Sequence, residues 1–244
     1  MLKDSIIILA WPQTPAKAIG RWYDGITKFF GFLKDGYYSA GHAAAVLVNH
    51  STKELHYFDF GRYHMPSKFG RARDHETDPG LLIKTKLILS DDQKILNIKE
   101  ILNELNQNKN FHGKGPLYAS ILEQVSFNSA YNYAKSIQNK DAVPYGPYEY
   151  RGTNCSRFIT SIAKQSKPSR KIKFRLSASL LLTPLTKANV FACCNTYYKI
   201  QDNTVTTHLQ RYKDQLKNFM LPFYIQSDSK LRQTSTVQFQ VETI

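Results

Sequence analysis

The chain of 244 residues is long enough to bury a hydrophobic core without disulfides or metal ions. It has 33 Lys and Arg against 19 Asp and Glu, and the formal charge of +14 favours anionic partners without choosing between nucleic acid, lipid and an acidic substrate. The three cysteines cannot form the disulfide framework of a secreted protein, because Cys193 and Cys194 are adjacent and Cys155 stands alone. We therefore expect a reducing compartment.

The N-terminal part of the chain predicts a strand, a helix and a hairpin. The apolar run 6–11 is too short for a signal peptide or a membrane span, so it predicts a buried strand in a cytoplasmic protein, with another export route left open. A proline suits the first turn of a helix over residues 15–33. The small apolar segment 41–48 and the aromatic segment 55–60 predict a hairpin whose first strand opens with His42.

The middle of the chain alternates between loops and regular elements. The polar segment 61–80 predicts a loop, and the alternating segment 81–89 predicts a strand. Apolar residues at helical spacing predict a helix over 91–105 that is capped by Asp91. A short strand is expected near 117–120, and a helix over 126–137.

The C-terminal half contains the segment Asn154-Cys155-Ser156-Arg157-Phe158-Ile159, which opens a helix after an irregular stretch. The remaining expectations are a basic loop over 167–174, a helical turn over 177–182, an extended segment over 189–200 and a helix over 207–219. We assign residues 1–225 to one domain, and residues 226–244 to an edge strand or a loose tail.

Cys155 is placed for thiol chemistry, because a helix N-terminus stabilises a thiolate through its free N–H groups and its dipole. A cysteine on a helix is more often a small buried hydrophobe, but the polar neighbours Asn154, Ser156 and Arg157 favour a site at a cleft. The pair Cys193–Cys194 has no supporting His or Cys cluster, so we interpret it as packing and predict no metal site.

A thiol nucleophile also needs an imidazole base and a polar group that orients the base. His42 is the best of the seven histidines, because it lies between a glycine and three alanines that leave room for another segment and a substrate. Across the hairpin, Asp59 can accept a hydrogen bond from the imidazole. The alternative for Asp59 is a plain salt bridge with Arg62 or Arg71.

The segment Gly41-His42-Ala43-Ala44-Ala45-Val46, followed by Asn154-Cys155-Ser156-Arg157-Phe158, resembles the circularly permuted branch of the NlpC-type, papain-like cysteine peptidases. That branch includes lecithin–retinol acyltransferase-like proteins and YiiX-like hydrolases, and the resemblance covers residues 38–164. It implies a papain-like α+β fold, with an antiparallel sheet in which the histidine strand precedes the cysteine helix. It also implies thiol attack on an amide or ester through an acyl-enzyme, without a cofactor.

The leading hypothesis is a peptidase, amidase or acyltransferase with Cys155, His42 and Asp59 as its catalytic residues. Tyr150, Asn154 and Arg62 are candidate substrate contacts, with the arginine suited to an acidic substrate. Peptidoglycan-type peptides are the substrate that the resemblance implies, and lipid esters stay open. The alternative is a catalytically inactive papain-like module that binds an acidic ligand. A nucleic-acid-binding role is weaker, because only the charge supports it.

Overall fold

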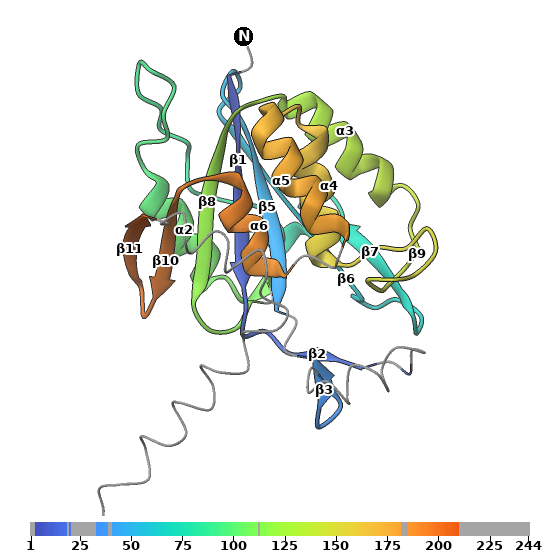
Figure 1. The fold of residues 1–244 in the computed structure, drawn as a ribbon. Helices are drawn as coiled ribbons and strands as arrows, with labels where there is room; N and C mark the ends of the chain where they lie inside the picture. Colours follow the sequence, from blue (N-terminus) through green and yellow to red (C-terminus); the bar gives the residue numbers. More distant parts are fainter. Residues whose placement is uncertain are drawn as a thin grey trace, which may run out of the picture.

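The computed structural model describes residues 3–18, 20, 33–38, 41–111, 113–181 and 185–209. An eight-stranded sheet runs through these residues in the order β11-β10-β8-β1-β5-β6-β7-β9 (Figure 1). Its strands are β1 (Asp4–Trp11), β5 (His42–Asn49), β6 (Glu54–Gly61), β7 (Phe69–Arg73), β8 (Leu117–Val125), β9 (Val143–Pro144), β10 (Thr196–Gln201) and β11 (Thr204–Leu209). A small second sheet contains β2 (Ala16–Lys17), β3 (Leu33–Lys34) and β4 (Tyr37–Tyr38).

Along the described parts of the chain, the α-helices alternate irregularly with the strands. They are α2 (Ile98–Gln107), α3 (Phe127–Gln138), α4 (Cys155–Gln165), α5 (Arg170–Leu181) and α6 (Thr186–Cys193). Two short 3-10 helices, η1 (Pro79–Leu81) and η2 (Lys109–Phe111), flank α2. All the strand pairings between these elements are antiparallel, so the expected α+β class is confirmed.

The large sheet is covered on both faces. Residues of α3, α4, α5 and α6 pack on one face, and residues of α2 and the 3-10 helices pack on the other (Figure 1). The central strands β1 and β5 are therefore buried almost throughout. This double covering explains why their sequences are continuous apolar runs and do not alternate with polar residues. Within the described residues, no helix is long and apolar enough to span a membrane.

The sheet register places His42 and Asp59 on the same face of neighbouring strands. Asp59 lies opposite Ala44 in the β5–β6 pairing, so its side chain projects on the same face as that of His42, two residues along β5. His42 lies opposite Trp11 of β1, at the end of both strands. The strand β1, the hairpin β5–β6, α3 and α4 confirm the corresponding expectations from the sequence.

The alternating segment 81–89 is not a sheet strand, which corrects the sequence expectation. Leu81, Ile83 and Leu87 are buried at alternate positions, but the segment lies across the face of the sheet. The side chain of Glu104 accepts hydrogen bonds from the backbone N–H groups of residues 84 and 85, at 2.7 and 2.8 Å. A carboxylate therefore replaces the neighbouring strand as the hydrogen-bond partner.

The helix expected from Asp91 begins later, at Ile98, after a turn and a bridge between Leu89 and Ile95. The segment 61–80, expected to be a loop, contains β7. The basic segment expected to be a loop over 167–174 enters α5 at Arg170. The segment expected to be extended over 189–200 is helical through Cys193 and then forms β10. In each case tertiary packing overrides the local preference.

Two expected helices are only partly covered by the described residues. The helix expected over 15–33 is wrong at residues 16–17 and 33, which are strand residues, and residues 21–32 lie outside the description. The helix expected over 207–219 is wrong at residues 207–209, which belong to β11, and the rest lies outside. The tail expected over 226–244 also lies outside the described residues.

Candidate active site

Cys155 is the first residue of α4, at the end of the sheet where β5 begins. The side chain of Asn154 caps this helix by accepting a hydrogen bond from the backbone N–H of Arg157 at 2.9 Å. The Cys155 side chain is 6% exposed, and its Sγ lies 4.0 Å from the carbonyl oxygen of Gly41. The helix therefore holds the thiol beside the residue that precedes His42.

His42 interacts with both of its expected partners. Its Nε2 lies 3.1 Å from Oδ2 of Asp59, and its ring stacks on Trp11 with the ring centroids 6.0 Å apart. The Cys155 thiol is close enough to the imidazole for a side-chain hydrogen bond. Because Asp59 occupies Nε2, the other ring nitrogen is the one free to face the thiol. The structure thus brings together the three residues that the sequence singled out.

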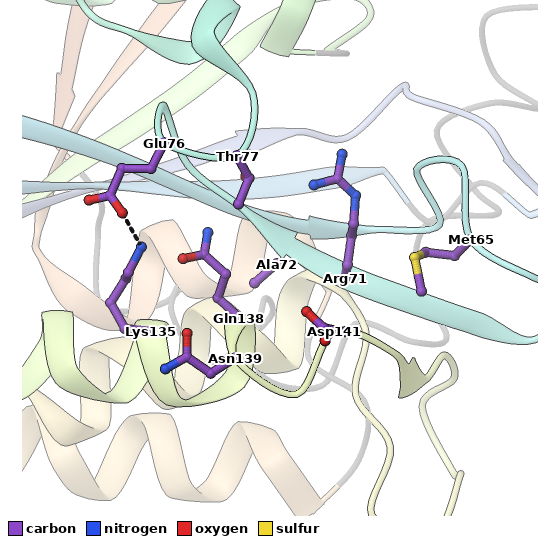
Figure 2. A pocket seen from close by; sticks show the side chains of 9 residues that line it. All are labelled: Met65, Arg71, Ala72, Glu76, Thr77, Lys135, Gln138, Asn139 and Asp141. Atoms are coloured by element: carbon purple, nitrogen blue, oxygen red, sulfur yellow. Dashed lines mark hydrogen bonds and ion pairs between the residues drawn. The ribbon is translucent and has the colours of Figure 1, made fainter.

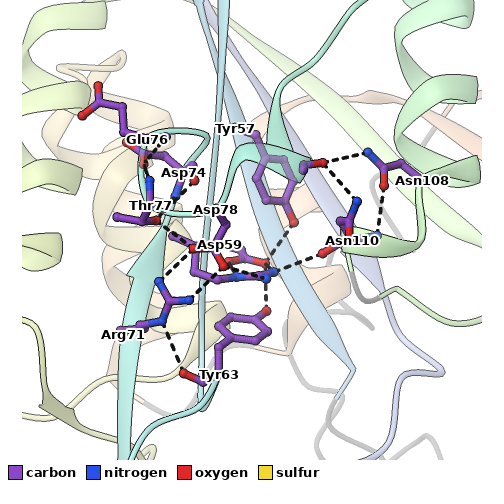
Figure 3. Close-up of polar contacts among 12 residues, drawn as sticks. Tyr57, Asp59, Tyr63, Arg71, Asp74, Glu76, Thr77, Asp78, Asn108 and Asn110 are labelled. Carbon is purple, nitrogen blue, oxygen red and sulfur yellow. Dashed lines mark hydrogen bonds and ion pairs between the residues drawn. The ribbon is translucent and has the colours of Figure 1, made fainter.

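Asp59 is fully buried and is the centre of a polar network (Figure 3). Arg73 donates to both of its carboxylate oxygens, from Nε at 3.0 Å and from Nη2 at 2.7 Å. The hydroxyls of Tyr57 and Tyr63 donate to Oδ2 at 3.1 and 2.8 Å. Four donors therefore converge on Oδ2: the N–H groups of His42 and Arg73 and the hydroxyls of the two tyrosines. Together they fix the orientation of the carboxylate.

The sequence missed Arg73, Tyr57 and Tyr63 as partners of Asp59. The expected salt-bridge partners were Arg62 and Arg71, whereas Arg71 forms a bidentate pair with Asp78 at 2.8 Å. The sequence predicted a loop where β7 lies, so the pairing of β6 with β7, which places Arg73 directly opposite Asp59, was not foreseen.

The electrostatics of the network favour a charged His42–Asp59 pair. Burial opposes the charged form of His42, but hydrogen bonds and charges of Asp59 and Cys155 outweigh it and raise the pKa of the imidazole to about 9. Burial likewise opposes ionised Asp59, but hydrogen bonds from His42 and Arg73 hold its pKa well below the ordinary value. Burial and the Asp59 charge raise the pKa of Tyr57 and Tyr63, so both hydroxyls keep their protons.

The first turn of α4 is also attached to α6. The buried side chain of Asn189 donates to the carbonyl oxygen and the hydroxyl of Ser156, at 2.9 and 3.0 Å, and accepts from Thr160 at 2.7 Å. Gly41 has a φ of +72°, and a Cβ there would lie 2.6 Å from Oγ1 of Thr186. Glycine is therefore required for the close approach of β5 and α6 beside the thiol.

The three candidate substrate contacts have other roles or positions in the structure. Asn154 caps α4, and Arg62 donates to the carbonyl oxygen of Lys17 at 2.8 Å. Tyr150 is 82% exposed, with the guanidinium of Arg151 5.2 Å from its ring centroid. No contact between described residues joins Arg62 or Tyr150 to Cys155, so their substrate roles stay predictions.

A cavity of about 570 Å³ lies between β7 and α3, and neither Cys155 nor His42 is among the residues that line it (Figure 2). Its polar lining includes Arg71, Glu76 and Lys135, and the last two are paired at 2.9 Å. Its charged groups are thus largely compensated by one another. The described residues contain no group of three His, Cys, Asp or Glu side chains that could hold a metal ion.

Comparisons with known proteins place these observations in a family. The family described as "Type VI secretion system effector TseH-like" matches residues 6–172. Among solved structures, a crystal structure of the type VI secretion system effector TseH matches with a TM-score of 0.55 and 17% identity, over 84% of this chain and 98% of that one. No curated protein matches the chain. At this identity, the structural match shows a common fold.

Proposed function

Since this chain belongs to the TseH-like family of type VI secretion system effectors, we propose that it is a cysteine hydrolase in which Cys155 is the nucleophile, His42 the base and Asp59 the orienting group. The observation that carries the proposal is the His42–Asp59 hydrogen bond of 3.1 Å beside a thiol at the first residue of a helix. A nucleophile, a base and a third group that orients the base are the arrangement that thiol acyl transfer requires.

Before substrate binds, the Cys155 proton has passed to His42, and the thiolate of this thiolate–imidazolium pair attacks the carbonyl carbon of an amide or ester. The tetrahedral intermediate collapses, the bond to the leaving group breaks, and the imidazolium of His42 gives its proton to the departing nitrogen or oxygen. A water molecule then gives a proton to His42 and attacks the thioester carbon. Collapse of the second intermediate releases a carboxylic acid and the thiolate, and the proton taken from water stays on His42, so the thiolate–imidazolium pair is restored.

The surroundings of the pair support this sequence of proton transfers. A raised His42 pKa keeps the imidazole protonated at neutral pH, so it can stabilise a thiolate and protonate a leaving group. The backbone N–H groups of Cys155 and Ser156 lie in the first turn of α4, where they have no partner within the helix. These N–H groups are the candidate donors for the oxyanion of the tetrahedral intermediate.

The finer fold assignment is also part of the proposal. The family match supports the papain-like, NlpC-type interpretation at the level of the superfamily, and the circularly permuted branch remains our proposal. The order along the chain favours that branch, because β5 with His42 precedes α4 with Cys155.

Membership in an effector family changes the expected place of action. The sequence alone favoured a cytoplasmic protein, whereas we propose that this chain is exported and acts on components of a target cell. Peptide bonds of peptidoglycan are the first substrates to test, and lipid esters are the second.

The test is to trap the acyl-enzyme. The intact protein is incubated with soluble peptidoglycan peptides or with phospholipid micelles, quenched in acid, and analysed by mass spectrometry. We expect an acyl adduct on Cys155 that is absent in Cys155→Ser and strongly reduced in His42→Ala, with new N-termini or free fatty acid showing the bond that is cut. Bond cleavage that continues in Cys155→Ser would contradict the assignment of the nucleophile.

The alternative is a catalytically inactive module that binds an acidic ligand. The burial of Cys155 is the observation that favours it, because a substrate must reach the thiol. This alternative predicts no adduct with any peptide or ester, together with binding that is unchanged in Cys155→Ser.

A further inference from the structure

The charges of the chain are segregated along the sequence. Residues 150–201 contain no Asp or Glu, whereas all 19 acidic residues lie outside this stretch. The stretch contains ten basic residues, namely Arg151, Arg157, Lys164, Lys167, Arg170, Lys171, Lys173, Arg175, Lys187 and Lys199. It includes α4, α5 and α6, which pack on one face of the sheet (Figure 1). This layer therefore carries many positive charges and no Asp or Glu.

The densest part of this layer is the connection between α4 and α5. Lys167, Arg170, Lys171 and Lys173 are exposed, and Lys164 is half-buried. Phe174 lies among them with 75% of its surface exposed. We call this surface the basic turn, defined by Lys164, Lys167, Arg170, Lys171, Lys173 and Phe174.

Stability of the fold does not account for the basic turn. Salt bridges within the described parts of the chain involve none of its five cations. Three of these cations lie in the first turn of α5, which has no acidic residue, although the helix dipole favours negative charge at that end. Leu176 of the same helix is buried, whereas Phe174 is left in solvent. A partner is therefore the better explanation for this cluster of cations around an aromatic ring.

The basic turn lies at the end of the sheet opposite the thiol. The backbone N–H of Ser126 donates to the carbonyl oxygen of Ser166 at 2.7 Å, which joins the end of α4 to the end of β8. There β8 pairs with the start of β1 at Asp4. The Asp4 carboxylate accepts from the backbone N–H groups of His50 and Phe127, at 3.2 and 3.1 Å, and so is already engaged.

We propose that the basic turn is a docking surface for an anionic phospholipid membrane. A lipid surface attracts several exposed Lys and Arg side chains at once, and the aromatic ring enters the interface between head groups and acyl chains. The basic turn has a single aromatic ring, the exposed Phe174 of α5. A single-stranded nucleic acid instead suits a basic groove lined by several stacking aromatic rings. This surface works without the thiol chemistry, so it stands or falls separately from the proposed hydrolase activity.

The experiment measures how the full chain sediments with vesicles of phosphatidylcholine, with or without phosphatidylglycerol. We expect binding only to the anionic vesicles, and loss of that binding as salt shortens the Debye length from about 10 Å at 0.1 M to about 3 Å at 1 M. Lys171→Glu/Lys173→Glu should weaken binding by at least about twenty-five-fold, since each basic residue near the surface contributes about fivefold. Phe174→Ser should weaken it by roughly tenfold.

The matched control is Lys94→Glu/Lys99→Glu, which makes the same change in net charge at exposed lysines. Lys99 belongs to α2, on the opposite face of the sheet, so this variant should bind nearly as well as the original chain. Cys155→Ser should bind equally well. Three results would overturn the proposal: no binding to anionic vesicles, equal losses in the two double variants, or tighter binding to a single-stranded oligonucleotide than to the vesicles.

Discussion

Replacing Arg73 by alanine is expected to lower the free energy of unfolding by about 3–5 kcal/mol, because it leaves a buried carboxylate without its main counter-charge. Asp59 is fully buried and Arg73 is 4% exposed, and two hydrogen bonds of 3.0 and 2.7 Å join them. With Arg73 removed, only His42 and two tyrosine hydroxyls would face the carboxylate. For a slope of about 2 kcal/mol/M, the urea midpoint should fall by about 2 M.

The assay is urea unfolding followed by tryptophan fluorescence, with Arg71→Ala as the matched control from the same strand. Arg71 and Asp78 form a bidentate pair, but their side chains are 22% and 23% exposed, so its loss should cost at most about 1 kcal/mol. The double variant Arg73→Ala/Asp59→Asn should be more stable than Arg73→Ala, because the uncompensated charge is gone. Equal losses for the two arginines would refute the reasoning, and so would a double variant less stable than Arg73→Ala.

Three further predictions concern the same end of the sheet. The raised pKa of His42 predicts a contribution to the free energy of unfolding that is fully present below pH 6.5 and is lost, by about 3 kcal/mol, as pH rises through 9. Unfolding measured across this pH range should show the loss in the original chain and not in His42→Gln. Gly41→Ala should cost at least about 2 kcal/mol in thermal unfolding, and more than Gly36→Ala, because both have positive φ but only Gly41 is crowded. Asn154→Ala should cost about 1 kcal/mol through loss of the helix cap, while Asn154→Ser should restore most of it.

The continuous strands β1 and β5 could be predicted because burial on both faces leaves a direct trace in the sequence. The runs that became β1 and β5 are apolar at nearly every position, and their length of eight residues each is typical of a strand. The hairpin then determined which face and which end of the sheet His42 and Asp59 share, so two of the three candidate site residues followed from local pattern and register.

The rest depended on contacts that no local pattern contains. The strand β7 has the sequence FGRAR, with two arginines that suggest a loop, yet one of them is buried against Asp59 and the other pairs with Asp78. The segment 81–89 has the alternation of a strand, but a glutamate of α2 binds its backbone. Contacts with carboxylates elsewhere in the chain decided both segments, and a single sequence does not show which carboxylate will be the partner.

The most direct test of the central claim is the rate at which iodoacetamide alkylates Cys155 between pH 5 and pH 10, followed by peptide mass spectrometry in the intact chain, His42→Ala and Asp59→Asn. The variant Cys155→Ser serves as the background control, because only Cys193 and Cys194 can be alkylated in it. We expect Cys155 of the intact chain to be alkylated rapidly near pH 6, with His42→Ala at least about tenfold slower at that pH and Asp59→Asn in between. The same slow, ordinary profile in the intact chain and in His42→Ala would contradict the thiol–imidazole pair.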